Sequence, residues 1–163
     1  MTMGPETGEG SPLEATTGYL DEHGVAYEVV EHGERFTAAA EARAAGVEPH
    51  NAAKSLLLKD EDGYELVVIP ASERLDLKKV RRALDRELRL ATEEEMGADF
   101  GRFELGALPP VGPMLPAPEV VDRRLLDHER VLCNAGDHRH SILVDPRDLV
   151  RVAGAQLADV CED

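Results

Sequence analysis

Two apolar runs separated by a tight turn constrain the fold of this chain more than any other feature. Residues 54–59 read Lys-Ser-Leu-Leu-Leu-Lys, the turn-forming segment Asp-Glu-Asp-Gly follows, and a second apolar run covers residues 64–70. Short runs of this kind, bounded by an Asp-Gly pair, are typical of two strands joined in a β-hairpin. The sequence therefore predicts a hairpin near the middle of the chain.

A lysine stands at the head of the first run. Side chains alternate across a strand, so Lys54 shares a face with Leu56 and Leu58. If that face is buried, the ammonium lies at the rim of a core, which is costly unless an anion meets it. Either Lys54 extends to solvent at the strand end, or it contacts a ligand.

Capping and turn signals predict helices and strands on both sides of this hairpin. Ser11-Pro12-Leu13-Glu14 is a capping box with proline at the first helical position. The other predicted helices follow Thr37, Asp76, Thr92 and Asp145, and the other predicted strands are residues 25–31, 89–91, 130–134 and 140–144. Hairpins mixed with single helices indicate an α+β domain with a mixed β-sheet flanked by helices.

Length and composition favour one domain in a reducing compartment. The 163 residues suffice for a single core, with residues 1–10 as a flexible, glycine-rich tail and residues 11–163 as the domain. No run approaches the ~20 apolar residues of a membrane span, so no membrane partner is expected. Two cysteines, Cys133 and Cys161, do not make a disulfide framework, which favours the cytoplasm.

The charge is strongly acidic but uneven. Thirty-three acidic against 18 basic residues give a net charge of −15, which argues against a general nucleic-acid coat. Basic residues concentrate in residues 74–89, which are either a solvated helix with internal ion pairs or a local basic patch. On the second interpretation the patch includes Lys78, Lys79, Arg82 and Arg86.

Common catalytic and metal-binding signatures are missing. Ala53-Lys54-Ser55 is similar to the tail of a phosphate-binding P-loop, but Ala53 stands directly before the lysine, where the motif requires glycine. His138 and His140 are two apart on a predicted strand, with His128 and Cys133 nearby, yet no C-x-x-C or H-E-x-x-H spacing supports a metal. Surface histidines beside an acidic loop are the commoner explanation, so we expect no metal and no cofactor.

The segment Leu-Gly-Ala-Leu-Pro-Pro-Val-Gly-Pro, residues 105–113, carries more information. Prolines fix the backbone, and glycines let it approach a ligand or take a positive φ. Such a loop can present N–H groups in a fixed array, although a purely structural crossover would use the same residues.

Four segments in this order resemble one known family: "NAAKSLLLK", "LVVIPASERLDLKKV", "GALPPVG" and "LCNAGDHRHSILVDPRDLVRV". They look like the YbaK/EbsC family, the aminoacyl-tRNA deacylase domain that is also inserted in some prolyl-tRNA synthetases, over about residues 12–160. The resemblance implies an α+β fold, hydrolysis of the ester that joins a wrong amino acid to the tRNA 3′ end, and partnership with aminoacyl-tRNA and an aminoacyl-tRNA synthetase. A binding module that recognises an aminoacyl or nucleotide group without hydrolysis is the alternative.

The same resemblance implies the site residues. The family lysine maps onto Lys54 as the catalytic residue. The substrate-binding residues that it implies are Gly106, Ala107, Pro110, Gly112, Asn134, Gly136 and His140. Some members have two glycines where this chain has Gly106-Ala107, which leaves the role of the backbone there open.

Ester hydrolysis demands little of the protein beyond charge stabilisation. Water or a substrate group can attack the ester, and the enzyme supplies donors where the carbonyl becomes an oxyanion. Backbone N–H groups near Gly106 could do this, while Lys54 could hold the terminal phosphate, polarise the ester or, if desolvated, act as a base.

Overall fold

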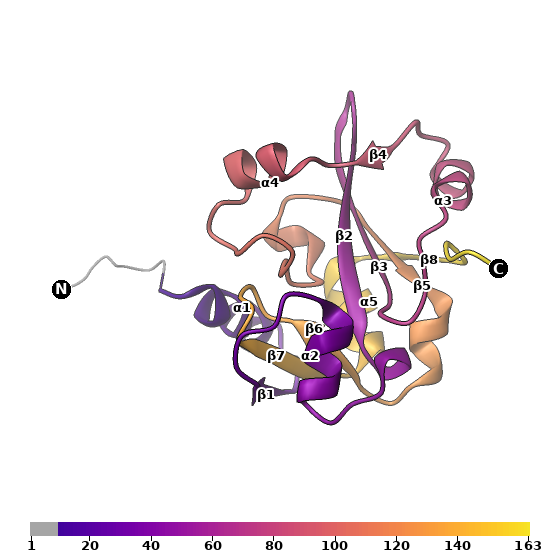
Figure 1. The fold of residues 1–163 in the computed structure, drawn as a ribbon. Helices are drawn as coiled ribbons and strands as arrows, with labels where there is room; N and C mark the ends of the chain where they lie inside the picture. The colour runs from indigo at the N-terminus through magenta and orange to yellow at the C-terminus, as the bar shows by residue number, and fades with distance from the viewer. Residues whose placement is uncertain (1–9) are drawn as a thin grey trace.

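The predicted hairpin is present and runs through the centre of the molecule (Figure 1). In the computed structural model, which describes residues 10–163, β2 (Ala53–Asp60) and β3 (Gly63–Pro70) pair antiparallel along their whole length. The Asp60 carboxylate closes the turn by accepting hydrogen bonds from the amides of Asp62 and Gly63, at 2.8 and 3.1 Å. The short side chain of Asp60 therefore stabilises the turn by accepting backbone hydrogen bonds, as the sequence indicated.

A five-stranded mixed sheet forms around this hairpin in the order β4-β2-β3-β5-β8. The three added strands are β4 (Arg89–Leu90), β5 (Glu119–Asp122) and β8 (Gln156–Ala158). β5 pairs parallel to β3, and β8 pairs parallel to β5. The expected mixed sheet is thus confirmed, but β5 and β8 were not predicted, because strands of four and three residues in parallel pairing carry no hairpin turn to reveal them.

A second sheet holds three antiparallel strands in the order β1-β7-β6. They are β1 (Tyr27–Glu31), β6 (Val131–Asn134) and β7 (His140–Val144). The two sheets meet where Ala52 pairs in parallel with Leu132 through an isolated bridge. The start of β2 is therefore the junction of the two sheets.

Within residues 10–163 five helices cover the sheets, and their caps are the ones that the sequence predicts. They are α1 (Pro12–Glu22), α2 (Ala38–Ala44), α3 (Leu77–Leu84), α4 (Glu93–Asp99) and α5 (Pro146–Ala153). Ser11 and Thr92 form complete capping boxes, while Thr37, Asp76 and Asp145 cap through their side chains. Single turns of 3₁₀-helix are η2 (Pro49–Asn51), η3 (Gly112–Met114) and η4 (Arg123–Asp127).

The hydrophobic core is divided by the five-stranded sheet. The larger cluster includes Leu20, Leu57, Val68 and Ile142, and the second packs under α3 through Leu58, Ile69 and Val80. β3 is buried on both faces from residue 65 to residue 70, which explains its nearly continuous apolar sequence. No helix within residues 10–163 is long and apolar enough to cross a bilayer. Of the predicted N-terminal tail, only Gly10 belongs to the described residues.

Candidate functional site

The glycine-proline loop and the turn after β6 are joined by a short ladder of hydrogen bonds. The Glu104 amide donates to the Gly136 carbonyl, and the Gly136 amide donates to the Ala107 carbonyl, both at 2.9 Å. The His138 ring then contacts the Leu105 carbonyl through Nε2 at 2.6 Å. Three of the predicted site residues, Gly106, Ala107 and Gly136, are therefore brought together from distant parts of the chain.

Both glycines at this junction adopt backbone conformations that favour glycine. Gly136 has φ +103° and leaves no room for a side chain, because a Cβ there would lie 2.8 Å from the Pro12 Cβ. Gly106 has φ +82°, but the nearest atom to its Cβ position is the His138 Cε1 at 3.6 Å. Gly136 thus packs the turn against α1, whereas Gly106 stays exposed.

The Gly106 amide is one donor that this loop leaves without a hydrogen-bond partner inside the described residues, as are the amides of Leu105 and Leu108. The neighbouring Ala107 amide donates to the Glu104 carbonyl at 3.0 Å. Gly106 N–H makes no hydrogen bond within residues 10–163. An available N–H on a loop held by its neighbours is the arrangement that stabilises an oxyanion.

His138 belongs to this junction, although the resemblance pointed to His140. The His138 ring is buried at 6% exposure, its amide donates to Glu104 Oε1 at 3.0 Å, and its Nδ1 has no hydrogen-bond partner among the described residues. The prediction that His138 lies on a strand is wrong: it lies in the turn between β6 and β7, because the chain bends at Gly136. The sequence shows only two histidines spaced two residues apart, and this spacing does not indicate which of them packs against the loop.

His140 is held elsewhere. Its Nδ1 lies 2.9 Å from the Asp137 carboxylate, and its Nε2 lies 3.5 Å from Glu31. Asp137 also accepts hydrogen bonds from the amides of Arg139 and His140, both at 2.8 Å, so it shapes the turn. Partial burial leaves part of the His140 ring accessible.

The Asn134 amide is used inside the protein. It donates to Glu41 Oε2 at 2.7 Å, and Ser141 donates to Glu41 Oε1 at 2.9 Å. His32 Nε2 completes this buried network at 3.0 Å from the Ser141 hydroxyl. Burial raises the pKa of the Glu41 carboxyl, and the hydrogen bonds from Ser141 and Asn134 oppose that rise. The network ties α2 to the three-stranded sheet.

Lys54 is the second residue of β2 and lies half-buried opposite Ile69. Ala52 and Leu132 form a parallel bridge, and Lys54 and Asn134 each lie two residues further along the chain. Because side chains alternate along a strand, Lys54 and Asn134 lie on the same face of the joined sheets. Burial lowers the pKa of the Lys54 ammonium, which forms no ion pair or hydrogen bond within the described part of the chain. None of the bonds that join loop 104–107 to residues 136–138 involves Lys54.

Pro110 and Gly112 lie deeper in the loop. Both are buried, and the Gly112 amide donates to Glu119 Oε1 at 2.6 Å. A Cβ at Gly112 would collide with the Ala117 carbonyl. Burial raises the pKa of Glu119 to about 8. These residues shape the base of the loop.

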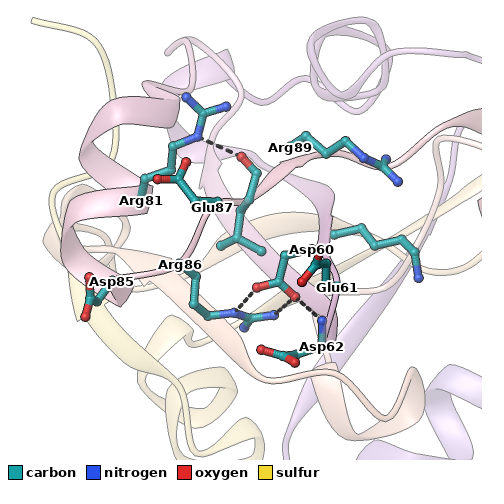
Figure 2. A pocket seen from close by; sticks show the side chains of 10 residues that line it. Asp60, Glu61, Asp62, Arg81, Asp85, Arg86, Glu87 and Arg89 are labelled. Atoms are coloured by element: carbon teal, nitrogen blue, oxygen red, sulfur yellow. Dashed lines mark hydrogen bonds and ion pairs between the residues drawn. The ribbon is translucent and has the colours of Figure 1, made fainter.

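The predicted basic patch is largely satisfied within the protein. Figure 2 shows Arg86 turned toward Asp60, and the guanidinium reaches Asp60 at 2.8 Å and Glu65 at 2.7 Å. Lys79 contacts Asp159 and Asp163. Neither interpretation from the sequence describes Lys79 and Arg86: both form ion pairs, but their partners lie outside α3, and Arg86 itself follows the end of α3. Two other predicted members, Lys78 and Arg82, are exposed and form no ion pair within residues 10–163.

The depression in Figure 2 has mixed charge. Arg81 donates through Nε to the Leu88 carbonyl at 2.8 Å and is not directed at an acid. The acidic side chains that line the depression outnumber the basic ones: Asp60, Glu61, Asp62, Asp85 and Glu87 against Lys59, Arg81, Arg86 and Arg89. This surface is a poor candidate for phosphate binding.

The four residues considered as metal ligands, which are His128, Cys133, His138 and His140, do not form one cluster. His128 packs against His50 at 5.6 Å between ring centroids, and Cys133 is buried in β6. Within residues 10–163 no three histidine, cysteine, aspartate or glutamate side chains lie together as a metal site requires.

Comparisons with known proteins identify the family. The model of the aminoacyl-tRNA editing domain matches residues 32–152, and the chain belongs to that family. A solved structure of a proposed trans-editing enzyme for prolyl tRNA synthetase is 34% identical, has a TM-score of 0.84, and is matched over 93% of this chain and 98% of its own. The family resemblance and the α+β fold expected from the sequence are thereby confirmed.

Two curated relatives point to the same family. The proline–tRNA ligase of Thermosipho melanesiensis is 40% identical over 68 residues, and that of Thermotoga maritima is 41% identical over 68 residues. Each alignment covers 41% of this chain, but the chain spans only 12% of the length of either ligase. The likeness therefore concerns one segment of each ligase.

Proposed function

We propose that this protein hydrolyses the ester bond between a wrongly attached amino acid and the 3′ end of a tRNA. The observation that carries the proposal is the Gly106 amide, which makes no hydrogen bond within residues 10–163 and lies in a loop held by bonds between Glu104, Gly136 and Ala107, in a chain of the aminoacyl-tRNA editing family. Hydrolysis of an activated ester needs a held carbonyl and a stabilised oxyanion more than it needs a strong nucleophile.

Gly106 and Lys54 have complementary roles in this proposal. The Gly106 N–H donates to the oxyanion as water attacks the carbonyl carbon and the ribose oxygen departs with a proton. Lys54, half-buried and without an ion pair among the described residues, supplies positive charge to the terminal phosphate or to the ester. An ammonium that burial has partly desolvated interacts more strongly with an arriving anion than a solvated one does.

Contact with the body of the tRNA is weak and transient in this proposal. The net charge of −15 opposes a polyanion, and Lys79 and Arg86 already meet carboxylates of the chain. Lys78 and Arg82 are the members of the basic segment best placed to meet phosphates, because both are exposed. An aminoacyl-tRNA synthetase that delivers the mischarged tRNA would compensate for weak binding.

A deacylation panel tests the proposal. The natural starting substrate is tRNA for proline, charged in turn with proline and with smaller or similarly sized amino acids, because two relatives are proline–tRNA ligases. We expect release of free amino acid from at least one mischarged tRNA, unchanged by a chelator. Binding of charged tRNA without release from any member of the panel would favour the non-catalytic binding module.

A further inference from the structure

Exposed apolar side chains gather around the buried His138. Among the described residues, four large hydrophobic side chains are strongly exposed, and two of them, Phe36 at 66% and Leu105 at 46%, belong to residues that contact His138. The Phe36 ring centroid lies 4.9 Å from that of His138, whose Nε2 is bonded to the Leu105 carbonyl. Phe36, Leu105 and His138 are called the Phe36 platform below.

Local structure does not account for the exposure of Phe36. The residue stands directly before Thr37, the N-cap of α2, where an apolar side chain commonly packs against the fourth helical residue as a hydrophobic staple. That fourth residue is Glu41, which is buried and bonded to Asn134 and Ser141. The staple is therefore not available, and Phe36 belongs to none of the hydrophobic clusters of residues 10–163.

Two arginines flank the platform. The Arg35 amide donates to the His138 carbonyl at 2.8 Å, and the His32 amide donates to the Arg139 carbonyl at 3.0 Å. Both arginines are exposed, and neither forms an ion pair within the part of the chain that the structure describes.

The acidic groups nearest to these arginines along the chain are largely occupied. Asp137 holds the turn through the amides of Arg139 and His140, and Glu104 accepts from the His138 amide. Glu31 lies 3.5 Å from His140, while Glu34 is exposed. The platform thus carries free cationic groups on a chain that is otherwise strongly acidic.

We propose that the Phe36 platform binds the terminal nucleobase of the single-stranded tRNA 3′ end. This inference rests on the proposed function and specifies how its substrate is held. The base stacks on the Phe36 ring, the adjoining phosphate meets Arg35 or Arg139, and the aminoacyl ester then lies beside Gly106. An exposed aromatic ring next to unpaired arginines is the usual arrangement by which proteins hold single-stranded nucleic acid.

The position of the platform also makes chemical sense. Gly106 directly follows Leu105 in the chain, and the His138 ring approaches both residues. The terminal base and the ester are joined through one ribose, so the two sites must be neighbours. α3, which carries the predicted basic patch, lies apart from α2 (Figure 1), so it would contact a different part of the tRNA.

Binding of two uncharged tRNAs tests this inference without requiring hydrolysis. One is intact, and the other is the same tRNA lacking its terminal adenosine. We expect the native protein to bind the intact tRNA about tenfold more tightly, the range that stacking of one base supports. Phe36→Ala should bind the two tRNAs equally, whereas Phe36→Trp should keep the preference.

The matched control is Val29→Ala, which truncates another exposed apolar side chain, on β1. It should keep the preference for the intact tRNA, and melting curves should show that every variant is folded. Equal binding of the two tRNAs by the native protein, or a preference that survives Phe36→Ala as it survives Val29→Ala, would overturn the inference. Because no ester is present, loss of the preference in Phe36→Ala supports the platform whatever the deacylation panel finds.

Discussion

Lys54 is the residue whose environment best separates function from stability. It is half-buried, burial lowers its pKa, and it forms no ion pair or hydrogen bond within residues 10–163. A charged group in this situation destabilises the folded state while it stays protonated. Retaining it therefore suggests a role outside the packing of the chain.

Replacing Lys54 by alanine should abolish most activity while sparing the fold. We expect single-turnover deacylation to fall ~10²-fold or more, as when an electrostatic contact made in the transition state is removed. The melting temperature should stay the same or rise. Lys54→Arg should restore only part of the rate, because a planar guanidinium replaces a compact ammonium poorly in a shaped site.

The matched control for Lys54 is Lys59→Ala on the same strand. The Lys59 ammonium lies over the Tyr64 ring at 4.4 Å from its centroid. Lys59→Ala therefore removes one positive charge from β2, as Lys54→Ala does, but it removes only a contact with the Tyr64 ring. If Lys54→Ala deacylates a good substrate as fast as Lys59→Ala does, Lys54 has no catalytic role and is only the residue at the end of its strand.

Gly106 offers a second test at the residue scale. Its φ of +82° disfavours any residue with a Cβ, so alanine should either cost about 1–2 kcal/mol of stability or rotate the peptide away from its present direction. Since the Gly106 N–H is the proposed oxyanion donor, we expect kcat to drop at least ~10²-fold, the effect of losing one such donor.

Gly46 provides the comparison for that variant. It has φ +76°, follows α2 and has open space at its Cβ position, so Gly46→Ala imposes the same backbone strain away from the loop 104–107. The two variants should lose similar stability, and only Gly106→Ala should lose kcat. Parallel losses of kcat in both would remove the Gly106 amide from the mechanism.

At the scale of the elements, local chemistry determined what could be predicted. Ser11 and Thr92 each place a side chain that satisfies helix amides, so those helix starts were readable from a few adjacent residues. β5 and β8 owe their existence to neighbours distant in the chain, for example Leu66 beside Glu119. No short-range pattern encodes that pairing, and it was missed.

The candidate site divides in the same way. Gly106 and Gly136 were expected at the site because the family resemblance maps family residues onto them, and both adopt positive φ angles. The roles of His138 and Glu41 were not, because they depend on three-dimensional contacts with Leu105 and with Asn134. α1 belongs to this second group: Thr16 donates to the Ala135 carbonyl at 3.1 Å and thereby fastens the helix to the turn that carries Gly136.

The charge on α3 can be tested as a unit. In the double variant Lys78→Glu/Arg82→Glu, we expect KM for mischarged tRNA to rise several-fold with little change in kcat, because weaker phosphate binding affects substrate and transition state alike. The salt dependence of binding should also become shallower, by a slope of about one for each phosphate that the protein no longer neutralises.

A double variant on other elements controls for net charge. Arg130→Glu/Arg151→Glu makes the same change at exposed arginines that already pair with Glu28 and Asp148. If both double variants raise KM equally, the effect is general repulsion of a polyanion. α3 would then be a solvated helix with no specific tRNA contact.

At the scale of the whole molecule, two buried glutamates on neighbouring strands link the site loop to the hairpin. Glu119 begins β5, and its Oε1 accepts from the Gly112 amide while Oε2 has no partner within residues 10–163. Burial raises its pKa to about 8, and the nearby Glu65 carboxylate adds to the rise. Glu65 in turn binds Arg86 at 2.7 Å, which links the loop to the hairpin and to the segment after α3.

This arrangement predicts an unusual dependence of stability on pH. An unfolded glutamate loses its proton near pH 4.5, whereas folded Glu119 keeps its proton up to about pH 8. Its contribution is therefore fully present below pH 4.5 and is lost progressively as the pH rises to about 8. The opposite contributions of Glu95 and Asp159, whose pKa values are lowered to about 2 by bonds to Arg89 and Arg124, disappear only in stronger acid.

Melting curves between about pH 5 and pH 8 measure this effect. The native protein should lose stability steadily across that range, partly through Glu119 and partly through self-repulsion of a chain with net charge −15. Glu119→Gln keeps an oxygen to accept from the Gly112 amide but cannot ionise, so its stability relative to the native protein should increase as the pH rises. Glu48→Gln removes an exposed carboxylate instead and should follow the native curve at a constant offset. A constant offset for Glu119→Gln as well would show that Glu119 is ionised in the folded protein and that other charged groups set the slope.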